Sequence, residues 1–325
     1  MPAAWVLAVL LAGATVCAAE TVVLEESGQW RSVESLPRDL QAVRDLLDQR
    51  QPKKALKEIN KWLKQNKGGE VADVMDDALF LKAQAFFDRK RYYQAFETYE
   101  QLLDGYGASP WFEPALRQEV EIARRFLAGE KRIVWGFIRA SARTEGVEIL
   151  DRVVERWPGS ELAARALMMQ ADYYYQEGRF VEAQSTYQVI AESYSKSSFY
   201  EAALLRSAEA THAQYRGPRY DARCLTDARI RYEQYRARFP GPAEQLGLGE
   251  RLYRLDWAEA EKHYEIADYY GRTHREGAVR YYVSYLESHW PVSEWTRRAR
   301  ALLPPTPRSA EEAGGSNAAP GGSTP

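Results

Sequence analysis

A small residue followed four positions later by a large apolar residue recurs along this chain. The pairs are Ala55/Ile59, Ala95/Tyr99, Gly146/Leu150, Ala183/Tyr187, Ala228/Tyr232 and Ala278/Tyr282. Residues four apart lie on one face of a helix, one turn from each other. The small side chain lets a second helix approach closely, and the large one fills the groove a turn further on. The sequence therefore predicts helices packed against helices, with no run of strand-like alternation over most of its length.

The helix upstream of most pairs carries a small residue of its own. These residues are Ala83, Ala171, Ala208 and Ala267. The two small residues are 12 positions apart in Ala83/Ala95 and 11 apart in Ala267/Ala278, which predicts a turn one residue shorter in the last copy. Prolines that follow three copies end the second helix. The sequence thus predicts helical hairpins, with insertions near residues 128–143 and 215–226.

The order of residues within the copies resembles the tetratricopeptide pattern. This order is a small residue, an aromatic residue, Ala, a second aromatic residue and Pro. The copies are spaced more widely than the ~34 residues of a standard repeat, so longer helices or inserted loops are expected. We predict an all-α chain, an α-solenoid of about six tetratricopeptide-like helical hairpins over residues 36–303. Residues 20–35 are predicted to be an extended leader. Residues 304–325 are rich in Pro, Gly, Ser and Ala and are predicted to be a disordered tail.

Residues 2–19 carry no charged side chain and end in the small residues Cys17, Ala18 and Ala19. This pattern is typical of a secretory signal peptide over residues 1–19, cleaved after about Ala19. Two alternatives stay open, an uncleaved membrane span and a lipid attached to Cys17. The residues before Cys17 match a lipoprotein signal poorly.

Composition and motifs exclude several classes of function. The formal net charge is −2, so no basic excess is available to neutralise nucleic-acid phosphates. Two cysteines, Cys17 and Cys224, cannot form a disulfide framework once the leader is removed, nor a Cys-rich metal site. No phosphate-binding Gly-Lys-Ser/Thr loop occurs, and the four histidines lack metal-ligand spacing. We therefore predict no enzyme activity, no metal and no cofactor.

The stretch from Glu161 to Pro304 resembles the BamD family, the tetratricopeptide lipoproteins of outer-membrane protein assembly. The resemblance is carried by Ala171-Asp172-Tyr173-Tyr174, its copy Ala267-Asp268-Tyr269-Tyr270, the Gly/Pro/Arg/Asp-rich insertion at 217–221 and Phe239-Pro240. The segment 126–158 is similar to divergent bacterial members. The resemblance implies a non-enzymatic scaffold or receptor of the β-barrel assembly machinery.

The expected partners and location follow from the same resemblance. The partners would be outer-membrane assembly subunits and unfolded barrel-precursor peptides, and the protein would be exported to the periplasm or to the periplasmic face of the outer membrane of a Gram-negative-type bacterium. Membrane association through the N-terminus or through partners stays open. The alternative is a periplasmic tetratricopeptide adaptor in cell-wall or cell-division complexes of the Tol-Pal type. Such adaptors tend to add an N-terminal coiled coil, and residues 20–50 show no long heptad.

Candidate binding residues follow from the repeat numbering. With Ala83 and Ala171 at position 8, positions 5, 9 and 12 of the first helix face a concave groove. The predicted peptide-binding residues are Phe80, Gln84, Phe87, Met168, Asp172 and Tyr175. They mix apolar anchors with polar groups, as peptide-binding patches do. The alternative is that longer helices close this groove against the next hairpin. By resemblance, Arg272, Arg275 and Arg280 near the last turn would dock the assembly machinery.

Overall fold

The computed structural model describes residues 22–24, 30–32, 37–66, 74–134 and 138–303. The predicted signal peptide with Cys17, the predicted tail and most of the predicted leader lie outside the described residues. The chain consists of two compact units, the first up to Met169 and the second from Gln170.

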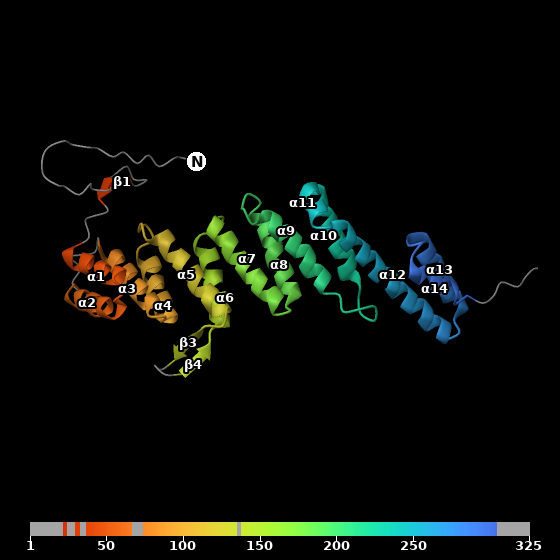
Figure 1. Ribbon diagram of the computed structural model, residues 1–325, viewed down its shortest axis with the longest axis horizontal. Coiled ribbons are helices and arrows are strands. Elements are labelled where there is room, and N and C mark those ends of the chain that lie inside the picture. The colour runs from red at the N-terminus through yellow and green to blue at the C-terminus, as the bar shows by residue number, and fades with distance from the viewer. Residues whose placement is uncertain (1–21, 25–29, 33–36, 67–73, 135–137, 304–325) are drawn as a thin grey trace, which may run out of the picture. The chain divides into compact units, whose positions relative to one another are not determined.

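Helices dominate the described residues and follow one another as antiparallel hairpins (Figure 1). The hairpins are α1 (Arg38–Asp48) with α2 (Pro52–Gln65), α3 (Met75–Asp88) with α4 (Tyr92–Gly105), α5 (Phe112–Leu127) with α6 (Arg143–Arg156), α7 (Glu161–Gln176) with α8 (Phe180–Ser193), α9 (Tyr200–Ala213) with α10 (Arg223–Arg238), and α12 (Leu248–Arg272) with α13 (Glu276–His289). The short helices α11 (Pro240–Gln245) and α14 (Glu294–Arg300) flank the last hairpin. The prediction of about six tetratricopeptide-like hairpins is confirmed.

Two small antiparallel strand pairs accompany the helices. Near the N-terminus, β1 (Val22–Leu24) pairs with β2 (Trp30–Ser32). Between α5 and α6, β3 (Lys131–Val134) pairs with β4 (Ile138–Ser141). The sequence predicted an insertion here, and it did not predict that two short strands pair within this insertion. Strands of four residues are too short for an alternating pattern to be recognised.

The small–large pairs of the sequence lie in the core. Ala95 and Tyr99 in α4 are fully buried, and so are Ala183 and Tyr187 in α8. In α6 the small position is Gly146, where an added Cβ would lie 3.1 Å from the Leu127 side chain and 3.2 Å from the carbonyl oxygen of Ala123. Close approach of two helices therefore explains the small residues, as the pattern predicted.

The last hairpin corrects the predicted repeat register. Val279 and Val283 are buried there, whereas Ala278 and Tyr282 are partly exposed. Val279 follows Ala267 by 12 positions, the same spacing as Ala83/Ala95, so the turn is not one residue shorter. Because a valine replaces alanine at this position, the sequence pattern did not reveal the true register. The neighbouring pair Ala278/Tyr282 matched the pattern instead.

Four hairpins share a three-residue turn whose middle residue has a positive φ. These residues are Arg50 (56°), Lys90 (58°), Gly178 (74°) and His274 (53°). In the last turn the His274 N–H donates to the Gly271 carbonyl and the Arg275 N–H donates to the Tyr270 carbonyl. This is the Schellman arrangement that closes a helix C-terminus and favours glycine at its left-handed position. Three of the four turns therefore have a residue other than glycine at the left-handed position, where a side chain is strained.

We expect His274→Gly to raise the free energy of unfolding by about 0.5–1 kcal/mol, because the left-handed strain of a side chain disappears. Gly178→Ala should lower it by a similar amount for the opposite reason. Urea unfolding followed by circular dichroism measures both. Opposite signs are the required result, and a loss of stability in both variants would contradict the turn geometry.

Candidate functional site

Phe80, the first predicted groove residue, faces the following hairpin within unit 1. Its ring stacks on Trp111 with centroids 4.2 Å apart and planes 18° from parallel. The indole Nε1–H of Trp111 donates to Oδ1 of Asp77 at 2.7 Å, which fixes that ring. Phe80 is partly buried and packs against the core of α3 to α7. It therefore already has an aromatic partner inside the protein.

Gln84 and Asp172 occupy the same repeat position and make the same kind of bond. The hydroxyl of the buried Tyr99 donates to Oε1 of Gln84 at 3.2 Å. In α7 and α8 the hydroxyl of the buried Tyr187 donates to Oδ1 of Asp172. In both pairs the tyrosine follows its acceptor by 15 positions. A buried tyrosine hydroxyl needs such a partner. Burial, and then the Asp172 carboxylate, raise the pKa of Tyr187.

Removing the Tyr187 hydroxyl isolates this bond. Tyr187→Phe is expected to lower the free energy of unfolding by about 1–2 kcal/mol, because Asp172 loses its donor. The double variant Tyr187→Phe/Asp172→Leu should recover part of the loss. Chemical denaturation of the single and double variants gives the coupling between the two residues. A double variant whose loss equals the sum of the single losses would mean that the bond contributes nothing.

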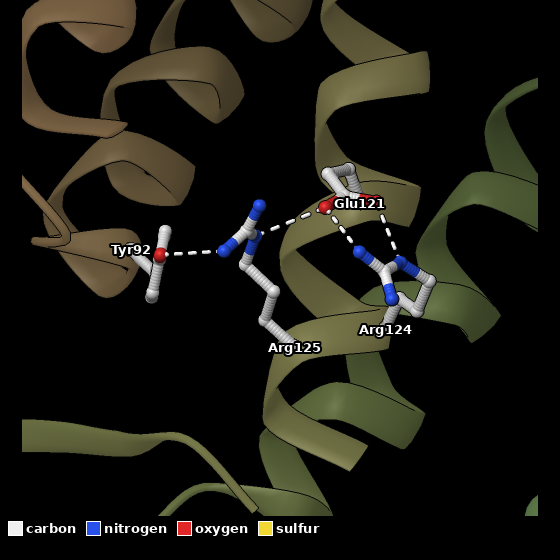
Figure 2. A network of polar contacts seen from close by, with 4 residues as sticks. All are labelled: Tyr92, Glu121, Arg124 and Arg125. Carbon is white, nitrogen blue, oxygen red and sulfur yellow. Dashed lines mark hydrogen bonds and ion pairs between the residues drawn. The ribbon is translucent and has the colours of Figure 1, made fainter. Parts of the chain in front are cut away.

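Phe87 lies under the guanidinium group of an arginine from the next hairpin. Arg125 is 5.3 Å from the Phe87 ring centroid and 5.1 Å from that of Tyr92. Figure 2 shows the same arginine donating to the Tyr92 hydroxyl and to Glu121, at 2.9 Å each, while Arg124 donates to Glu121 from the other side. One face of Phe87 is thus occupied by a network that joins α4 to α5.

The remaining groove residues lie on α7. Met168 is half-buried and belongs to unit 1, whereas Asp172 and Tyr175 belong to unit 2. The Tyr175 ring meets Phe180 at the start of α8, with centroids 5.2 Å apart. Phe80, Gln84 and Phe87 share one face of α3, and Asp172 and Tyr175 share one face of α7. Within each unit the predicted groove residues lie on a common helix face. Most of their side chains contact another side chain of the same unit.

The three predicted docking arginines surround the turn between α12 and α13, and all three are exposed. Arg272 pairs with Asp268, with Nε 3.0 Å from Oδ2. Arg275 lines a hollow of about 210 Å³ between this turn and the apolar residues Leu302 and Leu303. The turn therefore places exposed arginines beside a small recess whose lining includes the carboxylate Glu276 as well as apolar side chains.

A larger cleft, which the sequence did not predict, lies in unit 2 between α10, α12 and α13. Its volume is about 410 Å³. The lining residues are Asp221, Ala222, Arg223, Thr226, Arg229, Glu259, Lys262, His263, Tyr285, His289 and Trp290. The loop before α10 forms one rim, because Nζ of Lys262 donates to the carbonyl oxygens of Pro218 and Tyr220. The insertion seen in the sequence therefore builds one wall of this cleft.

Aromatic rings form the wall of the cleft on the α13 side. Tyr285 stacks on His289 with centroids 4.0 Å apart, and His263 lies 4.5 Å from Tyr285 and 5.7 Å from Trp290. Burial, with Lys262 and His289 nearby, lowers the pKa of His263. The neutral form of the His263 imidazole is therefore favoured, and its ring lies with those of Tyr285 and Trp290 in an aromatic surface.

Charged groups on the opposite wall are largely paired. Nη2 of Arg229 lies 2.6 Å from Oδ1 of Asp256 and 3.3 Å from Oε2 of Glu259. Arg223 pairs with Asp221 at 2.8 Å. The Trp290 indole donates to Asp256 at 3.2 Å and so connects the aromatic wall to the charged one. A cleft of this kind offers ring faces to an apolar side chain and a polar rim to a peptide backbone.

The family model for the tetratricopeptide repeat matches residues 40–110 and 135–198. These two parts of the chain are similar to tetratricopeptide repeats. Repeats of this kind form scaffolds for protein–protein interactions, which is the class of function that the match supports. No curated protein matches the sequence.

Several solved structures show low similarity to this chain. The C-terminal part of a TPR repeat-containing protein from Cytophaga hutchinsonii is 13% identical, covers 82% of this chain and 86% of its own, and gives a TM-score of 0.39. A tetratricopeptide repeat protein from Parabacteroides merdae is 11% identical, with coverages of 82% and 97% and a TM-score of 0.37. PilW, described as a widely conserved type IV pilus biogenesis factor, is 15% identical, with coverages of 81% and 97% and a TM-score of 0.29. Similarity of this size has no bearing on function.

Among the residues that the structure describes, no helix combines the length and the apolar character needed to cross a bilayer. In the same part of the chain, no group of three or more His, Cys, Asp or Glu side chains is placed to hold a metal ion.

Proposed function

We propose that this protein is a non-enzymatic scaffold of the bacterial envelope that binds peptide segments of outer-membrane β-barrel precursors and subunits of their assembly machinery. The repeat scaffold supports a protein partner, and the sequence resemblance to the BamD family supports the particular partner. Export to the periplasm or to the periplasmic face of the outer membrane belongs to the same proposal.

The observation that carries the proposal is the cleft between α10, α12 and α13. Its aromatic wall of Tyr285, His289 and Trp290 faces a rim of paired charges, and the cleft is large enough for one or two side chains. Phe80 and Phe87, in contrast, are already packed against Trp111 and Arg125. We therefore place the main peptide contact in the cleft and retain the α3 and α7 positions as separate, secondary contacts.

Site-specific crosslinking tests this proposal in the full chain. A photoactivatable residue is placed at His289 in the cleft, at Phe87 on α3, at Tyr175 on α7 and, as a control, at the exposed Gln234 on α10. The bait is the unfolded precursor of an outer-membrane β-barrel protein, with an unfolded cytosolic protein as competitor. We expect selective crosslinks from position 289, weaker ones from 87 and 175, and none from 234.

Two results would contradict the proposal. Equal crosslinking from positions 289 and 234 would remove the cleft as the contact, and equal crosslinking to the cytosolic protein would remove the barrel precursor as the partner. Fractionation of cells tests the location separately, because a protein found only in the cytoplasm contradicts export. Co-purification with cell-division subunits instead of assembly subunits would support the alternative function.

A further inference from the structure

Two basic dipeptides that are far apart in sequence meet beside the start of α4 in unit 1. Lys90 and Arg91 lie in the turn between α3 and α4, and Lys131 and Arg132 begin β3. The inserted hairpin brings them together, because β3 contacts α4. The four side chains surround a hollow of about 60 Å³, which is completed by Tyr92, Tyr93 and Gln94. We name it the basic hollow.

The charges of the basic hollow are not balanced by its own lining. None of the described lining residues is acidic. Glu145 offsets one of the four positive charges, since its Oε1 lies 3.0 Å from Nε of Arg132. Arg91 donates to the neutral side chain of Gln94 at 3.2 Å. Like charges held close together repel each other, and a bound anion would relieve that repulsion.

The walls of the basic hollow are held in place by neighbouring aromatic contacts. The guanidinium of Arg132 lies 5.3 Å from the ring centroid of Tyr93. The buried Tyr92 is fixed by Arg125 through the bond seen in Figure 2. A rigid frame lowers the entropy lost when a ligand binds. Exposed lysines alone would not form such a frame.

We propose that the basic hollow binds a phosphate group. Its volume suits one tetrahedral oxyanion, and two arginines with two lysines supply the forked and point-like donors that phosphate accepts. The convergence of four cations carries the inference, rather than the helix start, because α2 begins after the same kind of turn with Lys53 and Lys54 but without an inserted strand. The group comes from a free phosphate or from an anionic lipid headgroup.

Titration of the full chain with inorganic phosphate at constant ionic strength tests the site, with backbone NMR signals as the readout. The variant Lys90→Gln/Lys131→Gln removes two exposed charges from the basic hollow. The matched control Lys53→Gln/Lys54→Gln removes the same charge from the first turn of α2. We expect saturable shifts at residues 90–94 and 131–132, at least tenfold weaker binding in the first variant, and less than twofold change in the control. Lys90→Arg/Lys131→Arg should restore binding.

A second arm distinguishes the two sources. Flotation with phosphatidylglycerol vesicles is compared with flotation with phosphatidylcholine vesicles for the same variants. Binding of inorganic phosphate that depends on Lys90 and Lys131 supports a free phosphate. Binding only to phosphatidylglycerol, with the same dependence, supports a headgroup. Absence of both, or an equal loss in the control variant, would overturn the proposal.

Discussion

Glu119→Gln is expected to stabilise the protein by roughly 1–3 kcal/mol at pH 8, although the change removes an ionisable side chain from the core. Glu119 in α5 is fully buried, and within the described residues no N–H group donates to its carboxyl oxygens. Burial, and then the nearby carboxylate of Glu100, raise its pKa well above the ordinary value, against the opposing effect of Arg156 and Arg152. A glutamine side chain has nearly the same shape as the glutamate side chain, and it cannot ionise.

The pH dependence of this effect has a definite sign. Below the ordinary pKa of ~4.5 both the folded and the unfolded chain hold the proton on Glu119, so the variant and the wild type should differ least. As the pH rises above that value, the unfolded chain releases the proton first, and the folded state of the wild type loses stability until the raised folded pKa is passed. The advantage of Glu119→Gln should therefore grow between about pH 4.5 and pH 8.

Urea unfolding at several pH values measures this difference, and Glu97→Gln serves as the control because Glu97 is exposed on α4. The control should follow the wild type at every pH. A constant difference between Glu119→Gln and the wild type from pH 4 to pH 8 would show that Glu119 does not carry a raised pKa.

Ala183→Leu is expected to lower the free energy of unfolding by roughly 1–3 kcal/mol, because a larger side chain overpacks a close helix contact. Ala183 is fully buried at the point where α8 faces its neighbours. Ala228→Leu in α10 should behave in the same way, since Ala228 is also fully buried. Ala237→Leu, at an exposed position of α10, should change stability by less than about 0.5 kcal/mol.

Ala278→Leu separates the observed register from the one expected from the sequence. Ala278 is partly exposed, and Val279 takes the buried position. We therefore expect Ala278→Leu to cost clearly less than Ala183→Leu in thermal or urea unfolding. Equal losses in Ala183→Leu and Ala278→Leu would restore the sequence-based register and contradict the packing of α13.

The fold could be predicted because its packing rule is local in the sequence. Ala95 and Tyr99, or Ala183 and Tyr187, mark a helix face by spacing alone, and two such faces 12 residues apart imply a hairpin. The prediction failed where another residue type satisfied the same rule, as Val279 does. It also missed β3 and β4, because four-residue strands of an insertion leave no periodic signal.

The candidate binding site was harder to predict, because it depends on which side chains find partners elsewhere in the protein. Repeat numbering placed Gln84 and Asp172 on one face of their helices, but it could not show that Tyr99 and Tyr187 use them as hydrogen-bond acceptors. The cleft in unit 2 joins residues 221 to 290 across three helices. Its only sequence signals were the insertion before α10 and the grouping of Tyr285, His289 and Trp290.

Filling the cleft tests the account most directly. Thr226 is exposed on α10 and lines the cleft, so Thr226→Trp places an indole in the space that a peptide side chain would occupy. The affinity of the full chain for a fluorescent barrel-precursor peptide, measured by anisotropy, should fall at least tenfold in Thr226→Trp. It should change by less than twofold in Gln234→Trp, an exposed position of the same helix outside the cleft. Equal affinities of both variants and the wild type would contradict peptide binding in the cleft.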